Sequence, residues 1–193
     1  MPLDRKLALG GAFATVGVHE TPSPAVGAGR VLRYRVDIED GLADRGFDGA
    51  DIASSVERTL ADPRGWTHDG ALSFERVSAA EADFVITFAS PGTVDAWCAK
   101  AGLDTSEQTV SCDAQNTERV MINAYRWAQG STTYGDDMPG YRQMVVNHEV
   151  GHRIGHGHES CTADNAPAPV MMQQTKTLRS GAFTCAPNPW PYP

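Results

Sequence analysis

The sequence predicts a single α+β domain, and three observations support this prediction. Through Val31–Glu39, apolar residues alternate with charged residues, which is the period of a half-buried β-strand. Through Ala50–Leu60, apolar residues recur at every fourth position, the period of an amphipathic helix, which the Asp62-Pro63 step should end. After Gly155 neither period is present and prolines are frequent, so we expect an irregular C-terminal segment.

Composition limits the classes of function. The chain has 193 residues, of which 41% are hydrophobic and 21% charged, as in ordinary globular domains. Its formal net charge of -8 argues against a nucleic-acid partner, because phosphate binding needs a basic face. No run of 18 apolar residues is present, so this chain is not expected to span a membrane.

The remaining elements are predicted from the same periods and from turn-forming residues. We expect a first strand at Phe13–Val18 and a Pro- and Gly-rich loop at Thr21–Gly29, and prefer this to a signal peptide over Met1–Val18. Further strands are predicted at Leu72–Glu75, Phe84–Phe88, Gln108–Asp113 and Arg119–Asn123, and a short helix at Thr93–Lys100.

The four cysteines form two locally spaced pairs on either side of a histidine-rich segment. We expect disulfides between Cys98 and Cys112 and between Cys161 and Cys185, although four cysteines permit three pairings. No CxxC motif is present, which argues against a thiolate zinc site or a redox motif. An even number of separated cysteines favours an oxidising compartment; the alternative is four buried thiols in a cytosolic protein.

Four of the six histidines lie in the run HEVGHRIGHGH, from His148 to His158. This run fills every fixed position of the pattern HExxHxxGxxH, a chance match on the order of one in ten thousand chains of this size. A lone buried histidine is more often structural than a ligand, but three histidines at these spacings, with Glu149 between two of them, reverse that expectation. The run therefore predicts a metal site.

The spacing of the run agrees with metal chemistry. A helix predicted from Pro139 to Ile154 places His148 and His152 on one face, where two imidazoles can reach one ion. Gly155 can adopt a left-handed conformation, so the chain can turn and bring back His158 as a third ligand. Three neutral imidazoles leave the fourth position of one Zn²⁺ ion to water, as in catalytic zinc sites.

Glu149 follows the first predicted ligand and is the candidate general base. Its carboxylate would lie beside the zinc-bound water, take a proton during attack on a carbonyl carbon and pass it to the leaving amine. His156 does not fit the ligand spacing, and we expect it to lie beside the site or face solvent. His19 and His68 give no reason to place them in the site.

The histidine run resembles the zinc signature of the metzincin clan of metallopeptidases, whose members also place a methionine-containing tight turn, the Met-turn, beneath the metal. Residues 169–174, PVMMQQ, offer such a turn, and we assign Met171 to it. The segments NHEVGHRIGHGHESC, PVMMQQTK and NPWPYP more closely resemble an uncharacterised metzincin-like family of secreted or membrane-anchored proteins from GC-rich bacteria. An excess of arginine over lysine, 13 to 3, agrees with that origin.

The resemblance covers roughly Val31 to Met172 and implies a metzincin-like form of the α+β fold. This form has a twisted, mostly parallel N-terminal sheet with an antiparallel edge strand, two main helices and a small irregular C-terminal subdomain. The first subdomain would span residues 1–155 and end with the active-site helix, and the second, residues 156–193, would hold the Met-turn. We expect residues 190–193, WPYP, to anchor the C-terminus on the domain.

The sequence also departs from better-known metzincins. Glu159 resembles the residue that follows the third histidine in astacins, but no tyrosine stands two places beyond Met171 or Met172, where astacins keep one near the metal. The group that helps zinc to polarise the substrate carbonyl is therefore open. Three tyrosines are candidates on chemistry alone: Tyr134, Tyr141 and Tyr192.

Together these features predict a monomeric, extracytoplasmic bacterial zinc endopeptidase that acts on a peptide or protein substrate. The substrate would lie extended along a strand edge near Gln108–Asp113, which would bring its scissile carbonyl to the zinc. The alternative is an inert zinc-containing peptide-binding or inhibitor domain, against which the presence of Glu149 argues. A narrower processing or cell-wall amidase role shares the chemistry, and the sequence does not separate it from general proteolysis.

Overall fold

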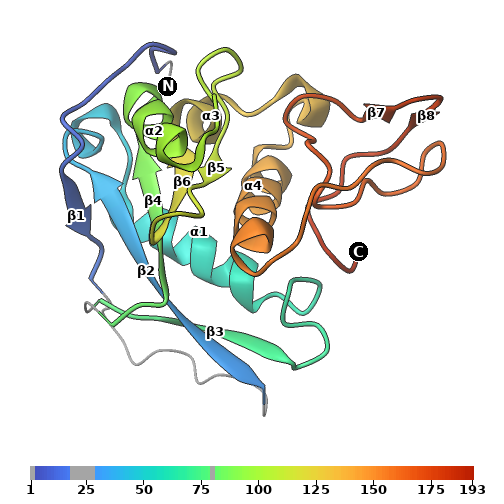
Figure 1. Ribbon diagram of the computed structural model, residues 1–193, viewed down its shortest axis with the longest axis horizontal. Coiled ribbons are helices and arrows are strands. Elements are labelled where there is room, and N and C mark those ends of the chain that lie inside the picture. The colour runs from blue at the N-terminus through green and yellow to red at the C-terminus, as the bar shows by residue number, and fades with distance from the viewer. Residues whose placement is uncertain (1–2, 18–28, 79–80) are drawn as a thin grey trace.

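The computed structural model describes residues 3–17, 29–78 and 81–193. Over these residues the fold is α+β, with a mixed six-stranded sheet, helices packed against it and an irregular C-terminal segment beside α4 (Figure 1). The predicted α+β class is therefore confirmed. The predicted loop Thr21–Gly29, apart from Gly29, and the last residue of the predicted strand Phe13–Val18 lie outside the described residues.

The sheet has the strand order β1-β2-β4-β6-β5, and β3 pairs with the first half of β2. The strands are β1 (Phe13–Thr15), β2 (Arg30–Glu39), β3 (Leu72–Arg76), β4 (Phe84–Ala89), β5 (Cys112–Asp113) and β6 (Arg119–Asn123). The pairs β2–β3, β2–β4 and β4–β6 are parallel, whereas β1 and β5 pair antiparallel with their neighbours. The sheet thus has a parallel centre and an antiparallel strand at each end of this order.

Four helices accompany the sheet in the described residues: α1 (Gly49–Ala61), α2 (Pro91–Cys98), α3 (Ala124–Gln129) and α4 (Met138–Arg153). The predicted helices agree with α1, α2 and α4 to within a few residues. The carboxylate of Asp48 accepts hydrogen bonds from two amides at the first turn of α1, which explains where that helix begins. Short 3-10 turns occur at Ala43–Arg45, Ala99–Ala101 and Thr132–Tyr134.

The prediction of a six-residue strand at Gln108–Asp113 is wrong for most of its length, because only Cys112–Asp113 pairs with β6. The guanidinium of Arg126 donates to the backbone carbonyls of Gln108 and Thr109, at 2.6 and 3.0 Å. Thr109 also has a φ of 52°, in the left-handed region that breaks a strand. The segment before β5 is therefore a loop fixed by side-chain hydrogen bonds.

The main core lies between one face of the sheet and the two longest helices. Leu32, Tyr34, Val36 and Ile38 of β2 are buried on this face, as their alternation predicted, and belong to one apolar cluster with residues of α1 and α4. All six residues of β4 are buried, which agrees with its continuous apolar sequence. This packing fixes α4 relative to the sheet.

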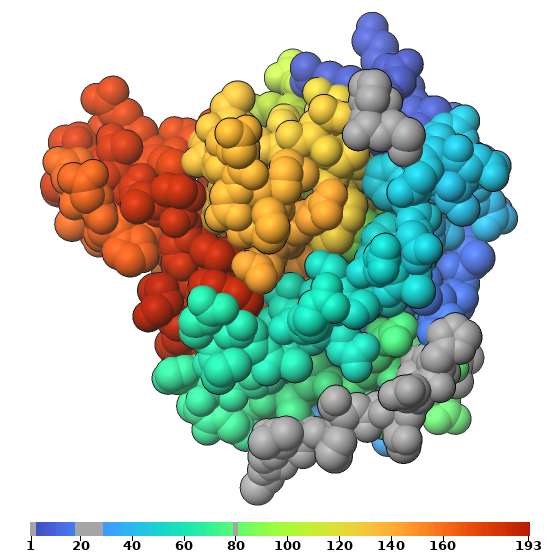
Figure 2. All heavy atoms as spheres, turned by 180° about the vertical axis from the view of Figure 1, so that it is seen from behind, coloured from blue at the N-terminus to red at the C-terminus, as the bar shows by residue number. Residues whose placement is uncertain are grey.

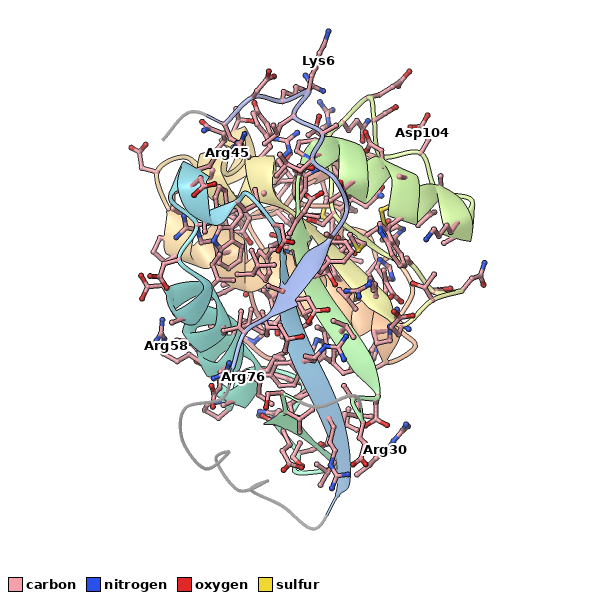
Figure 3. The ribbon with its side chains drawn as sticks, turned by 90° about the vertical axis from the view of Figure 1, so that its left-hand side faces the viewer. Lys6, Arg30, Arg45, Arg58, Arg76 and Asp104 are labelled. Carbon is pink, nitrogen blue, oxygen red and sulfur yellow. A yellow bond between two sulfur atoms is a disulfide. The ribbon has the colours of Figure 1, made fainter. Side chains whose placement is uncertain are left out.

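On the opposite face of β2, the acidic residues of the second half of the strand are buried. Asp37 accepts hydrogen bonds from Arg35 and Arg119, at 2.8 and 2.9 Å, and Glu39 accepts one from the Ser90 amide at 2.6 Å. Helix α2 belongs to a second, smaller apolar cluster on this side of the sheet, and Figure 3 shows α1 and α2 on opposite sides of β2. Asp37 and Glu39 are thus buried with hydrogen-bond partners, whereas Arg30 and Arg33, at the start of β2, are exposed.

Both predicted disulfides are confirmed. Cys98–Cys112 ties the end of α2 to β5, and Cys161–Cys185 closes a loop of the C-terminal segment. The described residues contain no free cysteine. The C-terminal segment also contains a two-stranded hairpin of β7 (Arg179–Ser180) and β8 (Phe183–Thr184), close to the second disulfide.

The C-terminus is anchored as expected. Trp190 is buried, the Asn147 side chain of α4 donates to the Pro189 carbonyl at 2.9 Å, and the Tyr192 amide donates to the Arg64 carbonyl at 3.0 Å. In Figure 2 the C-terminal residues, in red and orange, gather at one side of the molecule. No helix within the described ranges has the length and apolar character that crossing a membrane requires.

We expect the double substitution Cys161→Ser with Cys185→Ser to lower the free energy of unfolding by about 3 kcal/mol, because the bond closes a loop with a sequence separation of 24 residues. Denaturant unfolding of the wild type and the variant would measure the difference. Reduction of the Cys161–Cys185 bond in the wild type should reproduce it, and an unchanged midpoint would show that this disulfide contributes nothing to stability.

Candidate metal centre

The three predicted ligands lie together. The ligating nitrogens of His148, His152 and His158 are all within 4.8 Å of one another, and the ring centroids are 4.6–5.4 Å apart. Within the described ranges, this is the one group of three or more His, Cys, Asp or Glu side chains with metal-ligand spacing.

The end of α4 explains how His158 joins two residues of the helix. After Arg153 the chain leaves the helix through Gly155, whose φ of 104° agrees with the predicted sharp turn. The amide of Glu159 then donates to the Met171 carbonyl at 3.1 Å, which fixes the returning chain next to the Met-turn segment. His158 is therefore positioned by a glycine turn on one side and a backbone hydrogen bond on the other.

Backbone carbonyls orient the two helical histidines. The Nδ1 atom of His148 lies 2.8 Å from the Val170 carbonyl oxygen, and that of His152 lies 2.9 Å from the His156 carbonyl oxygen. A carbonyl only accepts, so each Nδ1 carries the hydrogen and each Nε2 keeps a lone pair for a metal. His156 lies beside the site, as expected, and its ring stacks on Trp66 with centroids 4.3 Å apart.

The distances and protonation states fit a zinc ion. The Nε2 atoms of His152 and His158 are 3.1 Å apart, close to the roughly 3.3 Å that separates two nitrogens on one tetrahedral zinc. Burial lowers the pKa of His148 to about 3 and also lowers the pKa of His158. Both imidazoles are therefore neutral near pH 7, which is the form that binds metal.

Glu149 is buried beside the histidines on the wall of a cavity. Burial, reinforced by the nearby Asp113 carboxylate, raises the pKa of Glu149 to about 8, whereas the Asp113 amide and the charge of Lys176 act to lower it. A bound dication would favour the ionised form. A positive charge near Glu149 would therefore lower the pKa of its carboxyl group from this raised value.

Asp113 and Arg153 connect β5 to the end of α4. Their side chains form an ion pair, and the Arg153 guanidinium also donates to the carbonyls of Thr117 and Arg119, at 2.8 and 3.1 Å. The edge strand is thereby fixed next to Glu149. Arg153 was not predicted to support the site, although it directly follows a predicted ligand, and Asp113 was predicted only as the end of the strand that would guide a substrate.

Met171 packs against α4 at Gly151, between His148 and His152. A Cβ atom added at Gly151, between the two helical ligands, would overlap the Met171 sulfur and would lie 2.8 Å from Trp66 Cζ2. Any larger residue at position 151 would therefore displace Met171 or Trp66. Met171 is almost fully buried.

The cavity that contains the histidines has a volume of about 330 Å³. Its walls come from α4 and from parts of residues 101–105, 110–115 and 173–176, and its apolar side chains include Leu103, Val110, Met144 and Val145. Lys176 also lines it. The residues before β5, which were expected to guide a substrate, thus form one wall of this cavity.

None of the three candidate tyrosines lines the cavity. Tyr134 is buried and donates to Gln174 Oε1 at 2.9 Å, and the Tyr141 hydroxyl lies 3.3 Å from Thr175 Oγ1. Tyr192 stacks on the ring of His68, with centroids 4.5 Å apart. In the described structure these tyrosines stabilise the C-terminal segment.

The fold and the cluster define an α+β protein with a candidate three-histidine metal centre. Over residues 7–193 the chain matches the model of a family described as "Protein of unknown function (DUF3152)", and it belongs to that family. A search of curated proteins gives no match to the chain.

The raised pKa of Glu149 makes a testable contribution to stability in the metal-free protein. Its pKa is about 8 in the folded state against an ordinary value of 4.5, so the folded state holds the proton more strongly. This contribution is complete below about pH 4.5 and is lost as the pH rises towards 8. We expect the stability of the wild type, relative to Glu149→Gln, to fall between pH 5 and 8.

Denaturant unfolding of both metal-free proteins across this pH range would measure the trend. Saturating zinc should remove it, because the dication favours the carboxylate. A difference between the two proteins that stays constant with pH would contradict the assigned environment of Glu149.

Proposed function

We propose that this protein is a zinc-dependent metalloendopeptidase of the metzincin type, with His148, His152 and His158 as ligands of one zinc ion and Glu149 as general base. The observation that carries the proposal is the convergence of three imidazoles beside a buried carboxyl group on one cavity wall. A purely structural three-histidine site has no need of that carboxyl group.

The surroundings of the histidines support the metzincin type. Two ligands come from α4, the third follows a glycine turn, and Met171 packs against α4 between the two helical ligands. The antiparallel edge strand β5 lies next to the same helix. The helical ligands and the glycine turn were expected from the spacing of the histidine run, and the Met-turn and the antiparallel edge strand from the resemblance.

The roles of the residues follow from their chemistry. When bound, zinc would act as a Lewis acid on the substrate carbonyl and would increase the acidity of water. Glu149 takes a proton from the attacking water and delivers it to the leaving amine, which requires a pKa within reach of neutral pH. The Asp113 backbone amide favours the ionised form of Glu149, and Arg153 forms an ion pair with the Asp113 side chain.

The cavity suggests where a peptide lies. β5 ends the strand order of the sheet, and Val110–Asp113 line the cavity beside Glu149. Because β5 has only two residues, a substrate can form few strand-like hydrogen bonds there. We therefore expect side-chain contacts within the cavity to contribute more to substrate choice than pairing along the edge.

Two disulfides support an extracytoplasmic location, because such bonds persist in oxidising compartments. This location agrees with proteolysis outside the cytoplasm. The alternative, an inert zinc-containing domain that binds peptides or inhibits another protein, differs only in whether Glu149 takes part in chemistry.

Glu149→Ala separates the two functions. The variant should retain one zinc ion per chain and bind peptide, yet lose roughly 10² to 10⁴ or more in cleavage rate, because a base and not a ligand is removed. Metal analysis and cleavage of a broad peptide library by zinc-loaded protein would measure both effects.

Two alanine variants act as controls. His158→Ala should lose zinc, whereas His156→Ala should keep it, because only the backbone carbonyl of His156 supports the site. Loss of zinc together with activity in Glu149→Ala would mean that the carboxylate holds the site together. A zinc-loaded wild type that cleaves no peptide would favour the inert binding domain.

A further inference from the structure

Lys176 is the cationic residue on the cavity wall nearest to the candidate metal centre. It lines the cavity together with His148, Glu149 and His158, and its positive charge acts on all three groups. It lies two residues beyond the Met-turn segment, and Gln173, Gln174 and Thr175 line the same cavity. Any ligand that enters this cavity therefore meets a positive charge beside the metal centre.

The backbone that presents Lys176 is firmly held. Gln174 is completely buried and bonds to the Tyr134 hydroxyl and to both the amide and the carbonyl of Asn188. The Thr175 carbonyl accepts a hydrogen bond from Ser131 at 2.8 Å, and the amide of Lys176 donates to the Gln173 carbonyl at 2.9 Å. The Lys176 side chain is thus exposed, whereas the backbone that carries it is held in place by hydrogen bonds.

The Lys176 ammonium has no ion-pair partner within the described parts of the chain. The acidic groups on the same cavity wall have other roles: Asp113 pairs with Arg153, and Asp104 accepts two hydrogen bonds from Ser106. Glu149 is the proposed base. A carboxylate on a bound peptide would therefore supply the ion-pair partner that the Lys176 ammonium lacks.

We infer that Lys176 selects substrates with a carboxylate close to the scissile peptide bond. The inference rests on the proposed peptidase function, since it names the substrate class of the same site. The carboxylate belongs either to an aspartate or glutamate side chain or to the free C-terminus of the peptide. Lys176 is a specificity residue in this role and takes no part in proton transfer.

The test compares matched peptides. Each pair differs only by glutamate against glutamine at one position within three residues of the scissile bond, with both ends of the peptide blocked. A parallel set compares free with amidated C-termini, which distinguishes the two sources of carboxylate. Zinc-loaded wild type, Lys176→Ala and Lys176→Glu are assayed for kcat/KM on every pair, and Lys6→Ala is the matched control.

Lys6 is a suitable control because its side chain is exposed and, in Figure 3, points away from the body of the molecule. We expect the wild type and Lys6→Ala to prefer the carboxylate-bearing member of at least one pair by about fivefold, the upper range for an exposed ion pair. Lys176→Ala should lose this preference and Lys176→Glu should reverse it.

Direct binding gives a readout that does not depend on turnover. Titration of the same peptides into zinc-loaded Glu149→Ala, with and without Lys176→Ala, should show the same carboxylate preference and its loss. If this preference is present but the wild type cleaves nothing, the specificity inference stands and the peptidase proposal fails.

Three results would overturn the inference while leaving the peptidase proposal intact. One is cleavage without any carboxylate preference in the wild type. The second is a preference that Lys176→Ala leaves unchanged. The third is an equal loss of rate on both members of every pair, which would make Lys176 a group that polarises the carbonyl. Peptides that neither bind nor are cleaved would contradict both proposals.

Discussion

Two hydrogen bonds from histidine rings to backbone carbonyls orient the candidate metal centre of this protein. The carbonyls of Val170 and His156 accept from the Nδ1 atoms of His148 and His152, which leaves the Nε2 lone pair of each ring available to a metal. Val170 belongs to the C-terminal segment, 22 residues after His148, so the centre forms only when that segment packs on α4. The buried contacts of Gln174 and Asn188 stabilise this packing.

The electrostatics of the centre suit a dication better than an empty site. Burial keeps His148 neutral and raises the pKa of Glu149, so in the metal-free state the site carries little charge. A bound cation would instead favour the carboxylate form of Glu149, because its positive charge compensates for the hydration that the carboxylate loses on burial. Metal binding would therefore be linked to ionisation of Glu149, which suits the proposed role of this residue as a base near neutral pH.

The apolar pattern of the sequence predicted those helices and strands whose apolar positions are the ones that become buried. β2, α1, β4 and α4 could be predicted because each presents a regular apolar face or a continuous apolar run. The segment before β5 could not, because Arg126 binds its carbonyls from a distant part of the chain, and α3 has only six residues, too few to show a period. The histidine spacing was visible in sequence, whereas Asp113 and Lys176 approach the centre only through tertiary contacts.

X-ray absorption at the zinc edge of the zinc-loaded protein tests the central claim, that three imidazoles of this cluster bind one metal ion. We predict a first shell of three imidazole nitrogens and one oxygen at about 2.0 to 2.1 Å, without sulfur. The imidazole signal should be lost in a variant with alanine at both His148 and His152. A shell of six oxygens, a sulfur ligand, or a spectrum that this double substitution leaves unchanged would contradict the claim.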